Sequence, residues 1–291
     1  MREIQLTVLA SDDHPLAATL FEPGRAPRAA ALINPATGVP RRYYRAYARY
    51  LAEHGYAVLS YDYRGIGDSR WHAARPSQLR MRWWGERDLA AMLQTLAQRY
   101  PRLPIAAIGH SAGGQLLGLA PNNRLVDAAL AVASQSGYWR LWPARLQPAM
   151  AALWYGVLPI AAHTAGRVPA ALIGHELPGG VAHEWARWCR SPHYISDERG
   201  QPLREHFDAF RGRMRFYAIA DDPFYAPLSA VQALADFYRN AERDVRVLDG
   251  RAYGLRRVGH FGFFRPASQA LWPATLGWLH DALAPKLAMA A

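Results

Sequence analysis

The stretch that decides the fold is Ile105-Ala106-Ala107-Ile108-Gly109-His110-Ser111-Ala112-Gly113. Its short apolar run is typical of a buried strand, and the run leads directly into the pattern Gly-x-Ser-x-Gly. In this pattern the serine lies on a sharp strand-to-helix turn that exposes its hydroxyl oxygen. Small residues at 112–114 suit the close approach of strand and helix, and residues 115–119 can continue as a helix. The stretch predicts a nucleophilic serine; the alternative is a glycine-rich turn with an idle one.

Two later segments supply the partners that such a serine needs. Serine is a weak nucleophile, so it requires a neighbouring base and a third group that orients the base. A strand-like run over residues 214–220 ends in Asp221-Asp222-Pro223, and a histidine follows in Val258-Gly259-His260-Phe261-Gly262. The order serine, acid, histidine is one of the known chain orders of a catalytic triad. We predict Ser111 as nucleophile, His260 as base and Asp222 as the orienting acid.

The choice of acid rests on local geometry. Asp221 and Asp222 are adjacent, so strand alternation sends their side chains in different directions. Asp222 directly precedes the proline-containing turn before the next helix, which favours it, and Asp221 is expected to support the loop. Asp249, at the end of the following strand, is a weaker candidate. His280 falls on the last predicted helix, where a surface position is expected.

The rest of the chain alternates strands and helices. We expect helices over residues 42–53, 83–99, 228–240 and 264–284, and strands over 3–10, 16–22, 29–33, 56–61, 104–108, 126–133, 213–220 and 245–248. The first two strands read as a hairpin. The later alternation predicts an α/β fold, a mostly parallel central sheet with helices on both faces.

The alternation stops between residues 134 and 211. This segment is longer than an ordinary connection and holds five tryptophans, Trp139, Trp142, Trp154, Trp185 and Trp188. We predict that residues 134–211 form a helical cap insertion and that residues 1–133 and 212–291 form the core. Such an insertion would lie over the carboxyl ends of the strands, where ligands bind. The alternative is a packing layer with no role in recognition.

Four segments resemble a known family: residues 34–38 (Asn-Pro-Ala-Thr-Gly), residues 62–69 (Asp-Tyr-Arg-Gly-Ile-Gly-Asp-Ser), the serine turn, and residues 259–264 (Gly-His-Phe-Gly-Phe-Phe). They resemble the α/β-hydrolase superfamily, in particular its bacterial serine-aminopeptidase-like (S33) and predicted-hydrolase branch. The resemblance implies the α/β-hydrolase fold. It also implies a structural role in the loop for Arg64 and Asp68.

The same resemblance implies an oxyanion hole made of two backbone N–H groups. The residue after the nucleophile, Ala112, supplies one of them. Many relatives carry His-Gly where this chain has Asn34-Pro35, and proline has no N–H. We therefore expect Ala36 to supply the second N–H group, with Thr37 as the next choice.

Composition argues against nucleic-acid binding, an intramolecular disulfide and a membrane span. The net charge is +11, but Lys286 is the only lysine and the arginines are scattered without a dense basic tract, so we expect no nucleic-acid partner. The single cysteine, Cys189, excludes an intramolecular disulfide and is expected to have a packing role, which fits a reducing cytoplasm. No apolar stretch suggests a signal peptide, and the longest one, residues 150–162, is too short for a membrane span.

The expected function is that of a serine hydrolase that cleaves a carboxylic ester through an acyl-enzyme on Ser111. The expected partner is a small-molecule acyl substrate with an apolar part, and no metal or organic cofactor is implied. The same triad would serve a peptidase or amidase, for which Glu176, Glu184, Asp197 or Glu198 could bind a substrate amine, or an acyltransferase. An alternative outside the enzymes is a non-catalytic binding protein with a hydrolase fold.

Overall fold

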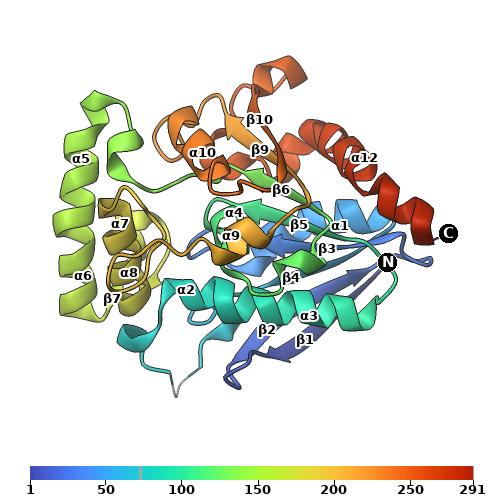
Figure 1. Cartoon of the computed structure of the whole chain (residues 1–291), viewed down its shortest axis with the longest axis horizontal. Coiled ribbons are helices and arrows are strands. Elements are labelled where there is room, and N and C mark those ends of the chain that lie inside the picture. Colours follow the sequence, from blue (N-terminus) through green and yellow to red (C-terminus); the bar gives the residue numbers. More distant parts are fainter. Residues whose placement is uncertain (72–73, 291) are drawn as a thin grey trace.

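Short runs of alanine, leucine, isoleucine and valine form the centre of the sheet. In the computed structural model, which describes residues 1–71 and 74–290, every residue of four neighbouring central strands is buried. Continuous burial is expected where helices cover both faces of a parallel sheet. The sheet has eight strands in the order β1-β2-β4-β3-β5-β6-β9-β10 (Figure 1). Their bounds are β1 (Arg2–Leu9), β2 (Pro15–Glu22), β3 (Ala29–Asn34), β4 (Tyr56–Tyr61), β5 (Ile105–His110), β6 (Ala128–Val132), β9 (Arg213–Ile219) and β10 (Glu242–Leu248).

The first two strands differ from the others in direction. Strand β2 runs antiparallel to both β1 and β4, whereas every pair from β4 to β10 is parallel. The carboxyl ends of β3, β5, β6 and β9 therefore meet at one edge of the sheet. The predicted strands agree with the observed ones to within a few residues, and the mostly parallel sheet is confirmed.

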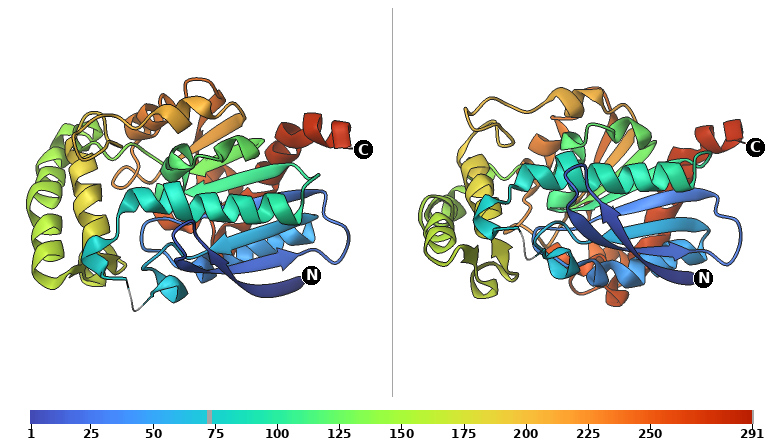
Figure 2. Two further views of the ribbon diagram at one scale, coloured as in Figure 1. Left: turned by 60° about the horizontal axis from the view of Figure 1, so that its bottom comes forward. Right: turned by 90° about the horizontal axis from the view of Figure 1, so that it is seen from below.

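Helices cover both faces of this sheet (Figures 1 and 2). Their bounds are α1 (Arg45–Glu53), α2 (Met81–Trp83), α3 (Ala90–Arg99), α4 (Ala112–Leu116), α5 (Gln147–Ala152), α6 (Leu158–Ala165), α7 (Ala170–Ile173), α8 (Gly179–Arg190), α9 (Glu205–Ala209), α10 (Leu228–Ala235), α11 (Gly259–Gly262) and α12 (Trp272–Ala290). One face carries α1 and α12, where Tyr47 and Tyr50 pack on Trp272 with ring centroids 5.3 and 5.2 Å apart. None of the helices in the described residues is long and apolar enough to cross a membrane.

The last two helical segments differ from the prediction. Helix α10 ends at Ala235 because the chain then turns inward: Tyr238 is fully buried and its hydroxyl donates to the Gly114 carbonyl at 2.8 Å. The single helix expected over residues 264–284 is instead a 3₁₀ stretch, Pro266–Leu271, followed by α12. Proline favours the start of a helical segment, which explains a new start at Pro266.

Most of residues 134–211 form a layer of helices beside the sheet, on the left in Figure 1 and away from both termini. The layer contains α5 to α8 and a small antiparallel pair, β7 (Arg167–Val168) and β8 (Leu177–Pro178). Helix α9, at the end of this range, packs on the core instead. Its Phe207 is fully buried, with its ring centroid 4.9 Å from that of Tyr238.

Candidate active site

Strand β5 ends at the serine that the sequence singled out. Ser111 follows β5 directly and precedes α4, and its backbone angles are φ 50° and ψ −114°. A non-glycine residue in this conformation is strained by about 1–3 kcal/mol, so the surrounding structure must hold it in place. The Ser111 N–H donates to the Val132 carbonyl of β6 at 2.9 Å, which fixes the turn against the neighbouring strand.

Glycines make this tight turn possible. A methyl group added at Gly113 would overlap the Asn34 carbonyl, and one added at Gly114 would overlap the Ser134 side chain. At Gly109 the added methyl would overlap the backbone of the following helix. Strand and helix therefore approach each other as closely as the serine turn requires.

We expect Gly113→Ala to lower the free energy of unfolding by about 3 kcal/mol, because the Asn34 carbonyl belongs to a buried strand and has no room to move. Urea unfolding measures this change. Gly277→Ala in α12 is the matched control: apart from the nearby backbone of its own helix, its methyl would meet no atom of the described residues within 4 Å. The substitution should raise stability by about 0.5–1 kcal/mol. Equal effects of the two substitutions would contradict the close approach at Gly113.

The predicted base and acid lie together. His260 Nδ1 is 2.6 Å from Asp222 Oδ2, and both side chains are buried. The second carboxylate oxygen, Oδ1, accepts the Tyr225 N–H at 3.2 Å, and the Tyr225 ring stacks on the imidazole with centroids 4.8 Å apart. His260 lies in the short helix α11, not in a loop. A carboxylate at Nδ1 leaves Nε2 as the ring nitrogen available for a second partner.

The neighbouring acid, Asp221, binds the backbone of the same segment just before His260. Asp221 accepts the N–H groups of Val258 and Gly259 at 3.0 and 2.9 Å. Asp249, by contrast, caps a 3₁₀ turn and pairs with Arg251 on the surface. His280 is partly buried, with its ring stacked on Tyr56, so the surface position expected for it is wrong. Of the acids considered, Asp222 is the one that the structure brings to His260.

The loop after β3 differs from the expectation. The Ala36 N–H donates to the buried Tyr44 hydroxyl at 2.8 Å, so it is already occupied. This bond counts against the prediction that Ala36 supplies the second oxyanion donor, because a side chain eight residues further along the chain already accepts its N–H. Within the described residues the Thr37 N–H has no hydrogen-bond acceptor. Thr37 lines the same cavity as Ser111.

A cavity of about 450 Å³ lies between the site and the layer of helices α5 to α8. Ser111 and His260 lie in its wall, although no hydrogen bond joins Ser111 Oγ to His260 in the described part of the chain; such bonds are often long without substrate. Of the cap tryptophans, three line the cavity, Trp142, Trp154 and Trp185. The remaining wall is mainly aliphatic and aromatic: Ala149, Met150, Ala152, Leu153, Val157, Leu172, Ile173, Phe224, Tyr225 and Phe261.

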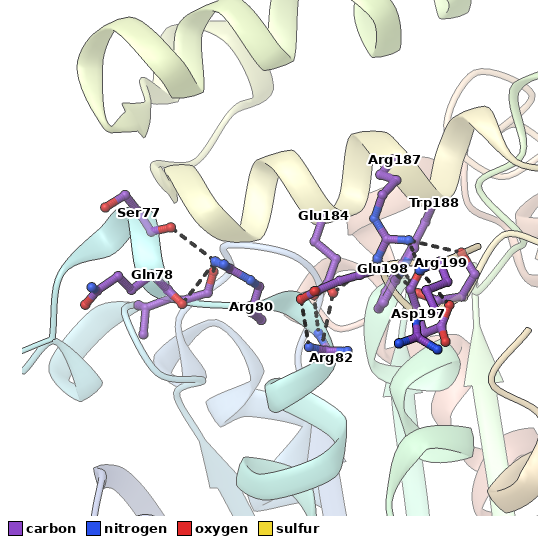
Figure 3. Close-up of polar contacts among 12 residues, drawn as sticks. Ser77, Gln78, Arg80, Arg82, Glu184, Arg187, Trp188, Asp197, Glu198 and Arg199 are labelled. Carbon is purple, nitrogen blue, oxygen red and sulfur yellow. Dashed lines mark hydrogen bonds and ion pairs between the residues drawn. The ribbon is translucent and has the colours of Figure 1, made fainter. Parts of the chain in front are cut away.

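The acids of the cap point elsewhere. Glu184 of α8 is buried and accepts the Arg82 N–H at 2.9 Å, as Figure 3 shows, and burial raises its pKa against the opposing effect of Arg82 and Arg187. Glu198 pairs with Arg82 as well, and the Asp197 carboxylate accepts backbone N–H groups. Glu176 pairs with Arg70 and Arg167. No Asp, Glu, Lys or Arg among the described residues lines the cavity.

Other singled-out residues have structural surroundings. Arg64 is buried between Asp88 and Asp12, and Asp68 pairs with Arg41. Cys189 is fully buried beside the cavity, and burial raises the pKa of its thiol, which keeps it protonated. Among the residues that the structure describes, no three His, Cys, Asp or Glu side chains are arranged to hold a metal ion.

Sequence reasoning missed two residues next to the site. His110 is fully buried, with Nδ1 2.8 Å from the Tyr44 hydroxyl and Nε2 2.9 Å from the His260 carbonyl. The x position of Gly-x-Ser-x-Gly gave no signal of this role, and the sequence places Tyr44 in a predicted helix without singling it out.

The architecture matches solved hydrolase structures over nearly the whole chain. The esterase domain of a Rhodothermus marinus protein is 19% identical, with a TM-score of 0.59, covering 97% of this chain and 99% of that one. A thermostable carboxyl esterase from Bacillus coagulans is 15% identical, with a TM-score of 0.63 and coverage of 97% and 99%. Est1E from Butyrivibrio proteoclasticus, solved with ferulic acid bound, is 16% identical, with a TM-score of 0.61 and coverage of 96% and 99%. At these identities the likeness shows the α/β-hydrolase fold.

Sequence comparison gives the family. None of the curated proteins compared with this chain matches it. The family model of the S33 serine aminopeptidases matches residues 25–175, from the first parallel strand to the cap, which is more than half of the chain. The α/β-hydrolase resemblance read from the sequence is thereby confirmed, and the chain belongs to the S33 serine aminopeptidase family of hydrolases.

Proposed function

We propose that the chain is a serine hydrolase that cleaves carboxylic esters through an acyl-enzyme on Ser111. The observation that carries the proposal is the strained serine in the wall of a cavity it shares with His260, whose Nδ1 is 2.6 Å from the buried Asp222 carboxylate. Ser111 Oγ attacks the acyl carbonyl as His260 Nε2 takes its proton, and His260 then gives that proton to the departing alcohol oxygen. Water then attacks the acyl-enzyme carbonyl as His260 takes its proton, and His260 returns that proton to the departing Ser111 Oγ, which releases the carboxylic acid.

The oxyanion that forms at the attacked carbonyl needs backbone donors. We assign them to the N–H groups of Ala112, directly after the nucleophile, and of Thr37. The occupied Ala36 N–H and the position of Thr37 on the cavity wall support this assignment. Asp222 holds His260 in the Nδ1–H tautomer and stabilises the imidazolium that forms during attack.

The cavity wall favours an ester over an aminoacyl substrate. A free amino terminus carries a positive charge, and burying it without a carboxylate partner is costly. The acids of the cap are engaged by arginines and backbone N–H groups outside the cavity, and the wall is apolar. We propose residues 134–200 as the cap that binds the apolar part of the substrate through Trp142, Trp154 and Trp185.

A panel of p-nitrophenyl esters beside aminoacyl p-nitroanilides tests this proposal. We expect kcat/KM to rise by up to about fourfold per added methylene, because each buried methylene contributes about 0.8 kcal/mol, until the cavity is full. Leucine and alanine p-nitroanilides should react at least about a hundredfold more slowly than the best ester, since their ammonium group lacks a partner. Faster cleavage of the anilides would sink the ester assignment in favour of a peptidase.

Two matched variants test where the acyl chain of the substrate binds. Met150→Trp should shorten the optimal acyl chain by filling the cavity, with little change for the acetate ester. Leu125→Trp, on an exposed turn away from the cavity wall, serves as the control and should leave the chain-length profile unchanged. Labelling by a fluorophosphonate probe separates the hydrolase from a non-catalytic binding protein, because the probe reacts only with an activated serine.

A further inference from the structure

Four groups from separate parts of the fold form one hydrogen-bonded chain behind the serine. The Ala36 N–H donates to the Tyr44 hydroxyl at 2.8 Å, and this hydroxyl lies 2.8 Å from His110 Nδ1. The other ring nitrogen, His110 Nε2, lies 2.9 Å from the His260 carbonyl. Tyr44 and His110 are fully buried. The chain Ala36–Tyr44–His110–His260 therefore links the loop after β3 to α11, across the residue next to Ser111.

The position of each hydrogen in this chain follows from the acceptors. The His260 carbonyl can only accept, so His110 Nε2 carries the hydrogen. Burial lowers the pKa of His110 well below its ordinary value, with the neighbouring His260 acting in the same direction, so the ring is neutral and Nδ1 is an acceptor. The Tyr44 hydroxyl accordingly donates to Nδ1 while it accepts the Ala36 N–H. Each donor of this hydrogen-bonded chain is therefore paired with one acceptor, and all three bonds point from Ala36 toward His260.

We propose that Tyr44 and His110 are positioning residues, which hold the oxyanion loop and the base in register on either side of the nucleophile. This inference rests on the proposed function of Ser111 and His260. By binding the Ala36 N–H, Tyr44 fixes the Pro35–Ala36 peptide, one peptide before the one that carries the Thr37 N–H. By binding the His260 carbonyl, His110 fixes the backbone of the base. Neither residue is among those that line the cavity.

Other contacts make the chain rigid. Tyr44 packs edge-on to Phe264, with ring centroids 5.0 Å apart, and the adjacent Tyr43 hydroxyl donates to the Phe261 carbonyl beside His260. Two successive tyrosines thus contact the segment that carries His260, Tyr43 by a hydrogen bond to Phe261 and Tyr44 by packing on Phe264. A shift of that turn would move the oxyanion loop and the base together.

The first test removes one hydroxyl. We expect Tyr44→Phe to lower kcat for a p-nitrophenyl ester by about 10- to 100-fold with little change in KM, since displacement of a catalytic group by about 1 Å has effects of that order. Fluorophosphonate labelling of Ser111 should slow in parallel. Tyr47→Phe is the control: Tyr47 is equally buried in the same helical region, and its hydroxyl bonds Thr275 at 3.1 Å, away from the site. Equal falls in kcat for both variants, or none for Tyr44→Phe, would overturn the proposal.

The second test separates hydrogen bonding at His110 from packing. His110→Asn keeps an acceptor near the Nδ1 position, His110→Gln keeps a donor near the Nε2 position, and His110→Phe keeps the ring and removes both. A positioning role predicts that Phe loses the most activity and that Asn and Gln each restore part of kcat. If Phe retains the most activity, the residue acts through packing alone and the proposal fails.

The third test needs no catalysis. In a ¹⁵N-edited NMR spectrum of the wild-type protein at pH 7, His110 should show the neutral tautomer with hydrogen on Nε2, and Tyr44→Phe should shift its Nδ1 resonance. A hydrogen on Nδ1 would overturn the proposed chain whatever the activity. Absence of ester hydrolysis by the wild-type protein would instead refute the proposed function, so the two failures are distinguishable.

Discussion

Ser111→Ala should lower kcat for ester hydrolysis by about 10⁴- to 10⁶-fold while leaving the fold intact. The methyl side chain removes the attacking oxygen, and only the oxyanion donors and the binding of substrate remain to lower the barrier. The residue is a site of backbone strain, and alanine carries the same Cβ as serine, so the strain is unchanged. Steady-state kinetics with the best p-nitrophenyl ester, and thermal unfolding of both proteins, measure the two parts of this expectation.

Ser134→Ala is the matched control for the nucleophile. Ser134 is also buried, packs against Gly114 of the same turn, and does not line the cavity. Its replacement should leave kcat within a few-fold of wild type. Fluorophosphonate labelling that persists in Ser111→Ala would reject Ser111 as the nucleophile.

Asp222→Asn should lower kcat by about 10⁴-fold. The carboxylate accepts from His260 Nδ1 at 2.6 Å, whereas an amide that donates there would stabilise the tautomer with hydrogen on Nε2. That tautomer is unable to take the serine proton. The stability of the fold should change much less than kcat, because Asn retains an oxygen able to accept the Tyr225 N–H.

The adjacent acid provides an internal comparison. Asp221→Asn should cost about tenfold or less in kcat, because Asp221 acts on the backbone of residues 258 and 259 and not on the imidazole. Its main effect should be a lower melting temperature. A larger loss of kcat for Asp221→Asn than for Asp222→Asn would show that Asp221 orients His260, and it would contradict the assignment of this role to Asp222.

The features predicted best are those fixed by local chemistry. The serine turn needs small residues at 109, 113 and 114, and the run of alanine and isoleucine before it is typical of a buried strand. Both features can therefore be recognised from consecutive residues of the sequence. The preference for Asp222 over Asp221 also rests on a local fact, the alternation of side chains at the end of a strand, and the structure brings Asp222 to His260.

The sequence does not predict features of the site that depend on contacts between separate segments. Whether the Ala36 N–H is free depends on Tyr44, which the sequence places in a predicted helix without indicating which group its hydroxyl binds. The three tryptophans of the cavity wall are likewise indistinguishable in sequence from Trp139 and Trp188, because a tryptophan in a core and one in a cavity wall look alike in sequence. Such assignments depend on how separate segments meet, and composition and periodicity carry no record of that.

The direct pairing of β6 with β9 has a consequence for how such a protein diversifies. The two strands are parallel neighbours, with Ala128 opposite Arg213, so the chain has to return from one end of the sheet to the other between them. A return of this kind needs a dozen or more residues, and α9 with its flanking segments lies against the core along that path. The helices that wall the cavity are thus an enlargement of an obligatory connection. Exchanging these helices would leave the register of the eight-stranded sheet in place, and if the proposed function holds, it would change the substrate that the cavity accepts.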